Sequence, residues 1–513
     1  MVRKGRKKLY IIGIDAAALW IIKENYKKYN LKGFEQFIRN GTLENMKSTL
    51  PPITPVAWPS IYTGLEPREH GIMDFFCIDK EYTKQLLYYD VAGKQPFWDA
   101  LSDHGIRSLV ITPPMVVNLN RKRNVDMMTG WPLPPKFSSE ELQKAAKRFA
   151  FKGEEDIEQD LQNGKIGIPE AFRRYEQSTV KRAKMARYLI ENRRYDLVFV
   201  AFTEVDRMQH YTLNRKDWKD YVMPLYKHIS DFIEWTMEHA RKEKEDATIM
   251  LVSDHGAQPI RHKFMINAWL VKNGYTVLKP GYARAFESKK ASGESKPGIK
   301  YTIREQIIKS KAKKLVYDRM PASLRRGVAK AMGGVLAAGS GEDYTRIHDF
   351  DIDMGKTRAF TSVSNNPVGL IWINDARFAD PQVNGNEKEQ LKKEISEELR
   401  KVKTLEGKSL VANIYDGAEY YKNTKEFIPP DLMVEVEKGY IVDIKDYSPT
   451  RIYIDPDIAR SGDHIREGIF GAIVPNGKRI KVQKDRINIY NFRQTVLSYF
   501  GLKEGRKGRA PMF

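Results

Sequence analysis

The stretch FVAFTEVDRMQHYTL (199–213) begins as an apolar run and ends with an acid and a histidine four residues apart. The run over 196–202 is short, continuous and strand-like, which indicates a buried strand. If the next residues are helical, Asp206 and His210 share one face of that helix. Taken alone, such a pair is more often a surface contact than a pair of metal ligands, so the rest of the sequence has to decide.

Four further apolar runs resemble buried parallel strands: LYIIGI (9–14), SLVIT (108–112), ATIMLVS (247–253) and GIFGAIV (468–474). Helical patterns lie between them, most clearly over 175–194 and 218–242. Strands that alternate with helices predict an α/β fold, here a three-layer α/β/α sandwich around a mostly parallel sheet. In such sheets, binding and catalytic residues usually lie just beyond the carboxyl ends of the strands.

Residues 281–350 break this rhythm. A polar stretch, ESKKASGESKPG, precedes two amphipathic helical patterns, and 281–330 holds 14 Lys/Arg against 4 Asp/Glu. We interpret 281–350 as an inserted basic, mainly helical cap, with 1–280 and 351–513 as the two parts of the catalytic core. The strand pattern resumes near 357–374, and a second excursion over the site is expected between 120 and 167.

The composition limits compartment and partners. A single cysteine, Cys77, excludes an intramolecular disulfide and favours a reducing compartment. The basic, apolar start of the chain lacks the length and cleavage site of a signal peptide, and no segment is long enough to cross a membrane. We therefore expect a cytoplasmic protein. The net charge of +21 suits nucleic acid, anionic lipid or a phosphorylated substrate as partner.

Acids and histidines recur at the ends of the predicted strands. Asp15 follows the first run, Asp254 and His255 follow another, and Asp463 and His464 precede the last. Each could be an ordinary cap or loop residue. However, the chain has only nine histidines, and three of them lie near an Asp at a strand edge. Six such ligands (Asp15, Asp206, His210, Asp254, His255 and His464) are too many for one tetrahedral ion and suit two.

A candidate nucleophile lies in PPITPVAW (51–58). Thr54 stands between Pro52 and Pro55, and a helix beginning near Pro55 would make Thr54 its N-cap, where backbone N–H groups favour an anion. A divalent ion that stabilises the alkoxide would activate this weak nucleophile. An ordinary N-cap is the alternative.

The motif order resembles the alkaline phosphatase superfamily, and within it the type I phosphodiesterase/nucleotide pyrophosphatase family. The motifs are Asp15, Thr54 with TG (63–64) and HGI (70–72), Asp206-x-x-x-His210, Asp254-His255-Gly256 and Gly462-Asp463-His464. The resemblance implies an alkaline-phosphatase-like fold and a metal-dependent phosphodiesterase or pyrophosphatase. It implies two divalent ions, with Zn²⁺ favoured and Mn²⁺ or iron tolerated.

The same resemblance assigns roles to residues. It gives Asp206, His210 and His464 to one ion, and Asp15, Thr54, Asp254 and His255 to the other. Thr54 would form a covalent phospho-enzyme that metal-activated water later releases. Asp463 would be a neighbour of the ligands, and His70 would be structural.

One position departs from the family. An asparagine that holds a phosphate oxygen in nucleotide pyrophosphatases follows the HGI segment, and the matching residue here is Phe75. The phosphate must then find another donor, either a backbone N–H or a residue of the cap.

Other functions stay open. A sulfatase would need Cys or Ser, then Pro and Arg, where this chain has Thr54, Val56 and Trp58. A phosphomonoesterase or phosphomutase could use almost the same ligands. In another class altogether, a basic protein could bind nucleic acid or an anionic membrane without catalysis. We expect a small phosphate diester or pyrophosphate as substrate and contact of the basic cap with an anionic substrate or membrane surface. Nothing in the sequence indicates an oligomeric state.

Overall fold

The structure is a computed structural model, and it describes most of the chain. The described residues are 7–86, 94–119, 122–153, 155–280, 352–362, 365–422, 424–456, 460–475, 477, 479–503 and 509–513. The predicted basic cap, 281–350, lies outside them, so the cap and its boundaries stay a prediction. No helix among the described residues is long and apolar enough to span a membrane.

The centre of the molecule is a seven-stranded sheet with the order β2-β19-β8-β1-β7-β5-β6. Strand β1 pairs in parallel with β7 and β8, and β5 pairs in parallel with β6 and β7. The predicted α/β fold with a mostly parallel sheet is confirmed. The strands are β1 (Lys8–Ile14), β2 (Thr42–Lys47), β5 (Ser108–Ile111), β6 (Val125–Met128), β7 (Leu197–Phe202), β8 (Ala247–Val252) and β19 (Glu467–Ile473).

One strand runs the other way. The run over 468–474 was expected to be parallel, but β19 pairs antiparallel with both β8 and β2. A continuous apolar run reports burial on both faces and carries no information about direction. The reversal matters because β19 begins at the edge where the parallel strands end. The residues just before it, including His464, therefore arrive at the carboxyl edge of the sheet.

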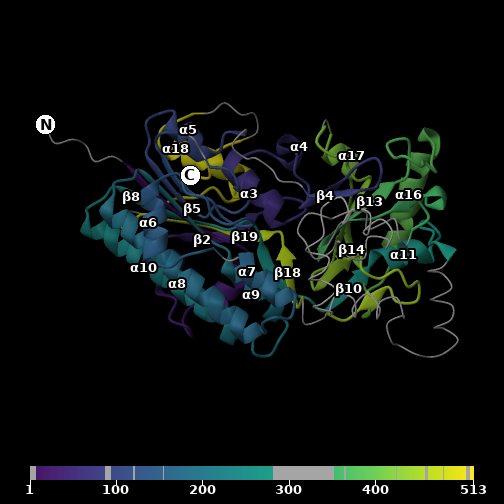
Figure 1. Ribbon diagram of the computed structural model, residues 1–513, viewed down its shortest axis with the longest axis horizontal. Helices are drawn as coiled ribbons and strands as arrows, with labels where there is room; N and C mark the ends of the chain where they lie inside the picture. Colours follow the sequence, from purple (N-terminus) through teal and green to yellow (C-terminus); the bar gives the residue numbers. More distant parts are fainter. Residues whose placement is uncertain are drawn as a thin grey trace, which may run out of the picture.

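Helices cover both faces of this sheet, as alternate residues of β1 show. Tyr10 and Ile12 belong to one buried cluster, whereas Leu9 and Ile11 belong to the other. The first cluster includes residues of α1 (Leu19–Asn25), α2 (Lys32–Asn40), α6 (Glu140–Arg148), α8 (Ile168–Asn192) and α10 (Trp218–Lys242). The second includes residues of α3 (Thr54–Thr63), α5 (Phe97–Ser102) and α18 (Phe492–Tyr499). Figure 1 shows α8 and α10 side by side on their face.

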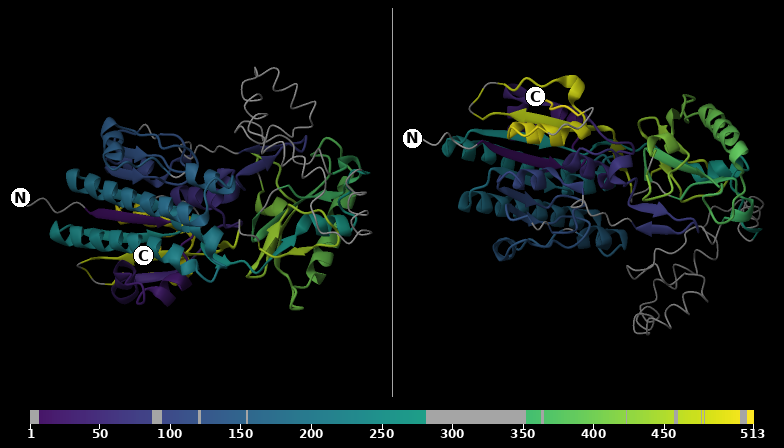
Figure 2. Two further views of the ribbon diagram at one scale, coloured as in Figure 1. Left: turned by 60° about the horizontal axis from the view of Figure 1, so that its bottom comes forward. Right: turned by 90° about the horizontal axis from the view of Figure 1, so that it is seen from above.

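A second lobe holds two smaller sheets, with orders β12-β16-β10-β17 and β11-β13-β15-β14. It lies at one end of the central sheet (Figures 1 and 2). The strand pattern near 357–374 belongs to this lobe, and the chain returns to the central sheet only at β19. Its elements are β10 (His262–Met265), α11 (Ile266–Lys272), η3 (Met354–Lys356), β11 (Ala359–Phe360), β12 (Asn365–Asn366), β13 (Val368–Ile373), α16 (Gly385–Lys401), β14 (Val411–Asp416), α17 (Gly417–Tyr420), β15 (Leu432–Val436), β16 (Tyr440–Asp443) and β17 (Tyr453–Ile454).

Only part of the segment 120–167 leaves the central sheet, although all of it was expected to pass over the site. Strand β6 completes the edge of the central sheet, so this part of the expectation is wrong. Helix α7 (Glu155–Gln162) lies beside α9 (Glu204–Thr212), where Glu158 pairs with Arg207 at 3.3 Å.

The other short elements are α4 (Pro67–His70), β3 (Phe76–Ile78), β4 (Lys84–Leu86), β9 (Gly256–Pro259), β18 (Gly462–Ile465), η4 (Lys484–Arg486) and η5 (Ile489–Asn491).

Strand β18 packs directly on α9. It pairs antiparallel with β9, and a Cβ on Gly462 would lie 2.3 Å from the Gln209 carbonyl oxygen and 2.7 Å from Leu213 Cβ. Only a residue without a side chain permits this approach, which carries His464 toward His210 on α9.

We expect Gly462→Ala to lower stability because its methyl group clashes with the backbone of α9. Overpacking of this kind costs about 1–3 kcal/mol. Thermal denaturation in the presence of a chelator measures it. Gly385→Ala is the matched control, since a Cβ at Gly385 meets nothing within 4 Å. Equal melting temperatures for the two variants would contradict this account of the packing.

His70 is buried in a structural setting. Its Nδ1 accepts from the Ile72 N–H at 3.1 Å, which leaves Nε2 to donate to Ser60 Oγ at 3.1 Å. Burial lowers the pKa of His70 to about 3. Between the ordinary value of about 6.5 and this value, the unfolded chain binds a proton that the folded chain does not. His70 therefore contributes stability that is present above pH 6.5 and is lost as the pH falls toward 3.

We expect wild-type stability to fall more steeply than that of His70→Gln as the pH drops from 6.5 to 4. The extra slope is at most about 1.4 kcal/mol per pH unit. Urea denaturation of both metal-free proteins across this range measures it. His262→Gln, which changes a surface histidine paired with Asp455, should follow the wild type. Parallel curves for wild type and His70→Gln would show that His70 is protonated in the fold.

Candidate binuclear metal site

The carboxyl edge of the central sheet gathers the residues that the sequence singles out. Asp15 follows β1, Asp206 and His210 lie on α9 after β7, and Asp254 and His255 follow β8. His464 arrives from β18. All six side chains are buried and form two groups: Asp206, His210 and His464, and Asp15, Asp254 and His255. The structure therefore brings together every predicted ligand, with Thr54 beside them.

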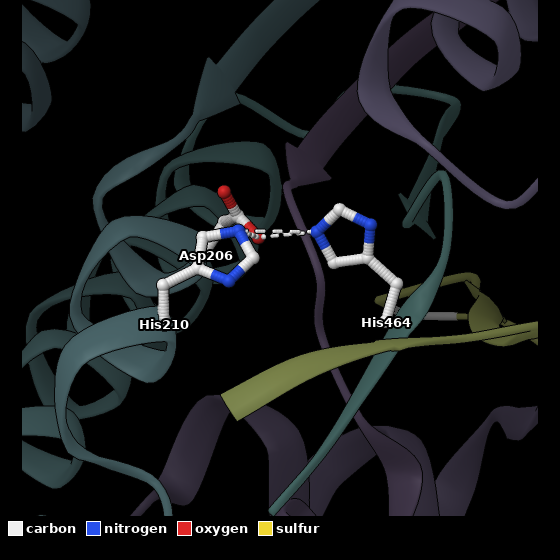
Figure 3. A group of neighbouring side chains, drawn as sticks. All are labelled: Asp206, His210 and His464. Carbon is white, nitrogen blue, oxygen red and sulfur yellow. Dashed lines mark hydrogen bonds and ion pairs between the residues drawn. The ribbon is translucent and has the colours of Figure 1, made fainter. Parts of the chain in front are cut away.

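The first triad has the size of a tetrahedral metal site. His464 Nε2 lies 3.1 Å from His210 Nε2, and Asp206 Oδ1 lies 3.3 Å from each of these nitrogens. Around a tetrahedral ion with bonds of about 2.0–2.1 Å, neighbouring ligand atoms lie about 3.3 Å apart. Figure 3 shows the three side chains directed at one another from α9 and β18.

Hydrogen bonds to the backbone orient two of the histidine rings. His210 Nδ1 lies 3.0 Å from the Gly462 carbonyl oxygen, and His255 Nδ1 lies 3.2 Å from the Gly256 carbonyl oxygen. A carbonyl oxygen only accepts, so each Nδ1 carries the proton, and in the neutral ring Nε2 presents a lone pair to the site. Lone pairs and a carboxylate that converge on one point repel one another unless a cation lies between them.

The second triad leaves two buried oxygens without a hydrogen bond. Asp15 Oδ2 accepts from the Trp58 indole N–H at 3.1 Å, and Asp254 Oδ1 accepts from the Ala16 N–H at 3.2 Å. The other oxygens, Asp15 Oδ1 and Asp254 Oδ2, have no hydrogen-bond partner among the described residues. They lie 3.8 Å and 3.0 Å from His255 Nε2. Each acid is thus held by one oxygen and offers the other to a ligand.

The protonation of these groups reflects crowding of like charge. Burial, then Asp254 and Asp206, raise the pKa of Asp15 well above its ordinary value. Burial opposes protonation of His255, but Asp254 outweighs it and raises the pKa of that ring. Burial and the neighbouring His255 lower the pKa of His464 to about 4. A divalent cation would relieve this conflict by letting the carboxylates ionise together.

The two triads touch. The rings of His255 and His464 stack with their centroids 3.8 Å apart and their planes at 28°. One histidine from each triad therefore forms the boundary between them. Two buried Asp/His triads in contact are consistent with a binuclear metal site.

Thr54 lies at the same boundary. Its Oγ1 is 3.4 Å from His255 Nε2. Thr54 is the first residue of α3 and Ile53 its N-cap, one position earlier than expected. The N–H groups of Val56 and Ala57 both donate to the Ile53 carbonyl, and Pro55 has none. The N–H group that the first turn can offer to an anion is therefore that of Thr54. The several free N–H groups that are usual at a helix N-terminus are not present here.

Neighbours of the triads hold them in place. Asp463 is outside both triads: its carboxylate accepts two hydrogen bonds from Arg460, at 3.1 and 2.8 Å, and one from the His464 N–H. Sequence reasoning missed the contact of Trp58 with Asp15, and it missed Arg207, which lies beside Asp206. Burial is the missing signal, since every residue of α9 is buried and the pattern alone does not show it.

Comparisons with known proteins bear on the fold and the family of the chain. No protein of curated function matches the sequence. The chain is similar in fold to the crystal structure of phosphonoacetate hydrolase from Sinorhizobium meliloti 1021 with phosphonoacetate, at a TM-score of 0.54 and 11% identity. The complex of that enzyme with phosphonoformate gives a TM-score of 0.55 and 10% identity. Each comparison covers 97% of this chain and 96% of the other.

The sequence model described as Type I phosphodiesterase / nucleotide pyrophosphatase matches residues 9–350. The match includes Asp15, Thr54, Asp206 and His255 and ends before His464. Since it spans well over half of the sequence, the chain belongs to the type I phosphodiesterase/nucleotide pyrophosphatase family of the alkaline phosphatase superfamily.

Proposed function

We propose that the protein is a metal-dependent phosphodiesterase or pyrophosphatase that acts through Thr54 and two divalent ions. The observation that carries this proposal is the position of the Thr54 hydroxyl, 3.4 Å from His255 Nε2 where the two triads meet. A protein that only binds anions has no need of a buried hydroxyl at the contact between two sets of unsatisfied ligands.

The donors favour Zn²⁺, with Mn²⁺ or iron as the ions they would also accept. In our proposal Asp206, His210 and His464 hold one ion. Asp15, Asp254 and His255 hold the other, with Thr54 as its fourth ligand. When bound, the ions would stabilise the charge on the attacking and leaving oxygens.

The chain's own residues then carry out two displacements. Thr54 Oγ1 forms a bond to phosphorus while the bond to the leaving alcohol or phosphate breaks, and the hydroxyl proton leaves with that group. Water then attacks the phosphorus, the bond to Thr54 breaks, and a proton from water restores the hydroxyl. The sum is hydrolysis of one ester or anhydride bond, and Trp58 keeps Asp15 oriented throughout.

The assay should include more than one class of substrate. The similar crystal structures hold phosphonates, so a phosphonate belongs in the panel beside a diester and a monoester. The basic stretch that motivates a binding function lies outside the described residues. Its contact with an anionic substrate or membrane, and a cytoplasmic location, stay predictions.

We expect the metal-free protein to take up two Zn²⁺ ions per chain, because two separate donor sets are present. His464→Ala should reduce this to one tightly bound ion, since it removes a ligand of the first triad only. Elemental analysis after gel filtration measures the ratio. His262→Ala, a surface histidine in β10, is the matched control and should keep two. An unchanged ratio in both His464→Ala and His210→Ala would exclude the first triad as a metal site.

We expect the zinc-loaded protein to hydrolyse an aryl phosphate diester faster than the corresponding monoester. Thr54→Ala should reduce turnover by about 1,000-fold or more, because it removes the nucleophile. Thr54→Ser should retain a hydroxyl and measurable activity. Initial rates of aryl alcohol release with several divalent ions test this.

The outcomes separate the alternatives. Preference for the monoester would favour a phosphomonoesterase, and cleavage of phosphonoacetate alone would favour a phosphonate hydrolase. Full turnover in Thr54→Ala would remove threonine as the nucleophile. No cleavage of any ester with any ion would leave the binding function as the better account.

A further inference from the structure

Among the described residues, those assigned so far leave one oxygen of the substrate phosphate without a side-chain donor. Phe75 stands where nucleotide pyrophosphatases have their asparagine, and a phenyl ring donates no hydrogen bond. The first turn of α3 contributes only the Thr54 amide, because the next N–H groups are used by the Ile53 carbonyl. A further cationic or amide donor should therefore lie near the triads.

Arg207 has the burial and position of such a donor. It directly follows Asp206 on α9 and is 6% exposed. Its Nη1 lies 3.3 Å from Glu158 Oε2 and 3.6 Å from Asp206 Oδ2. Its Nη2 is buried and donates no hydrogen bond among the described residues. A buried guanidinium N–H without an acceptor is unfavourable, so its presence beside an anion site indicates a ligand.

The positive charge of Arg207 interacts with an acid of each triad. It pairs with Asp206 of the first, and it opposes the effect of burial and of Asp254 on the pKa of Asp15 in the second. A phosphate held between the two ions would therefore lie within the field of a permanent cation.

Two aromatic rings hold the guanidinium in place. Its central carbon lies 4.0 Å from the ring centroid of Trp131, a cation–π contact. Trp131 in turn packs edge-on against Phe75, with centroids 5.5 Å apart and planes at 90°. The residue that replaces the family's asparagine thus supports the tryptophan that fixes Arg207.

We propose that Arg207 Nη2 donates a hydrogen bond to a non-bridging oxygen of the substrate phosphate, and that Trp131 positions the guanidinium for it. This inference rests on the proposed function and adds the donor that Phe75 cannot supply. The bond strengthens as negative charge develops on the phosphate oxygens, so its effect falls mainly on kcat.

The first test measures catalysis. Arg207→Ala should lower kcat for the aryl diester by about 100-fold or more, with a smaller rise in KM. It should still bind two Zn²⁺ ions, because no ligand is removed. Guanidinium ion added to the solution should restore part of the lost activity, whereas an equal concentration of sodium chloride should not. Arg207→Lys should lose less activity than Arg207→Ala, because lysine keeps the positive charge although it lacks the planar set of guanidinium N–H donors.

A second test does not depend on turnover. Inorganic phosphate titrated into the zinc-loaded protein should bind Arg207→Ala about 10-fold or more weakly than wild type, since one charge-assisted hydrogen bond is lost. Trp131→Ala should weaken phosphate binding less than Arg207→Ala does. Because this titration needs no ester cleavage, it gives a result even if the proposed hydrolysis fails.

A matched control separates this role from a purely structural ion pair. Glu158→Gln removes the other partner of Arg207 and should leave kcat within about 3-fold of wild type. If Glu158→Gln instead reproduces the loss in Arg207→Ala, the pair is structural and the inference is wrong. It is also wrong if Arg207→Ala binds two ions and phosphate as wild type does. If Arg207→Ala does not fold, Arg207→Lys and Arg207→Gln supply the same comparison.

Discussion

The structure depends on a concentration of like charge that only a cation can stabilise. Three carboxylates and three imidazoles converge at one edge of the sheet, and all six side chains are buried. Burying an ionised carboxylate costs several kcal/mol when it has no partner. Here Asp15 and Asp254 each leave an oxygen unbonded beside His255, and His210 faces His464 nitrogen to nitrogen. Such a site is unfavourable when empty and favourable around two divalent ions, so metal binding should contribute to folding as well as to chemistry.

The direction of β19 determines how His464 reaches the other ligands. Ligands from parallel strands meet at one edge because their carboxyl ends coincide, but His464 precedes its strand instead of following it. It reaches the site because β19 runs against its neighbours, so that the start of β19 lies where β1, β7 and β8 end. Gly462 then lets β18 rest on α9, which closes the first triad. The antiparallel direction of β19 is therefore what brings His464 to Asp206 and His210.

Some of these features can be predicted from the sequence, and others cannot. Residue types beside the apolar runs pointed to the six acids and histidines that the fold gathers, and the two prolines around Thr54 pointed to that residue. The direction of β19 could not be predicted, since burial on both faces gives the same run in either direction. Arg207 was missed because a charged residue in a helix is usually exposed, and only the packing of α7 and Trp131 buries it. The second lobe was missed because strands such as β11 and β12 are only two residues long, which is too short to give a recognisable apolar run.

The position of Arg207 has a further consequence for specificity. Asp206, Arg207 and His210 all lie in α9, a helix of nine residues that is buried throughout. In our proposal two ligands of one ion and the phosphate donor therefore belong to one rigid element, and the helix itself would fix the distance between that ion and the phosphate. An asparagine on the segment after HGI would be free of that constraint. Because Trp131 packs on the guanidinium and Phe75 packs on Trp131, the proposed donor is held in one orientation relative to Asp206 and His210.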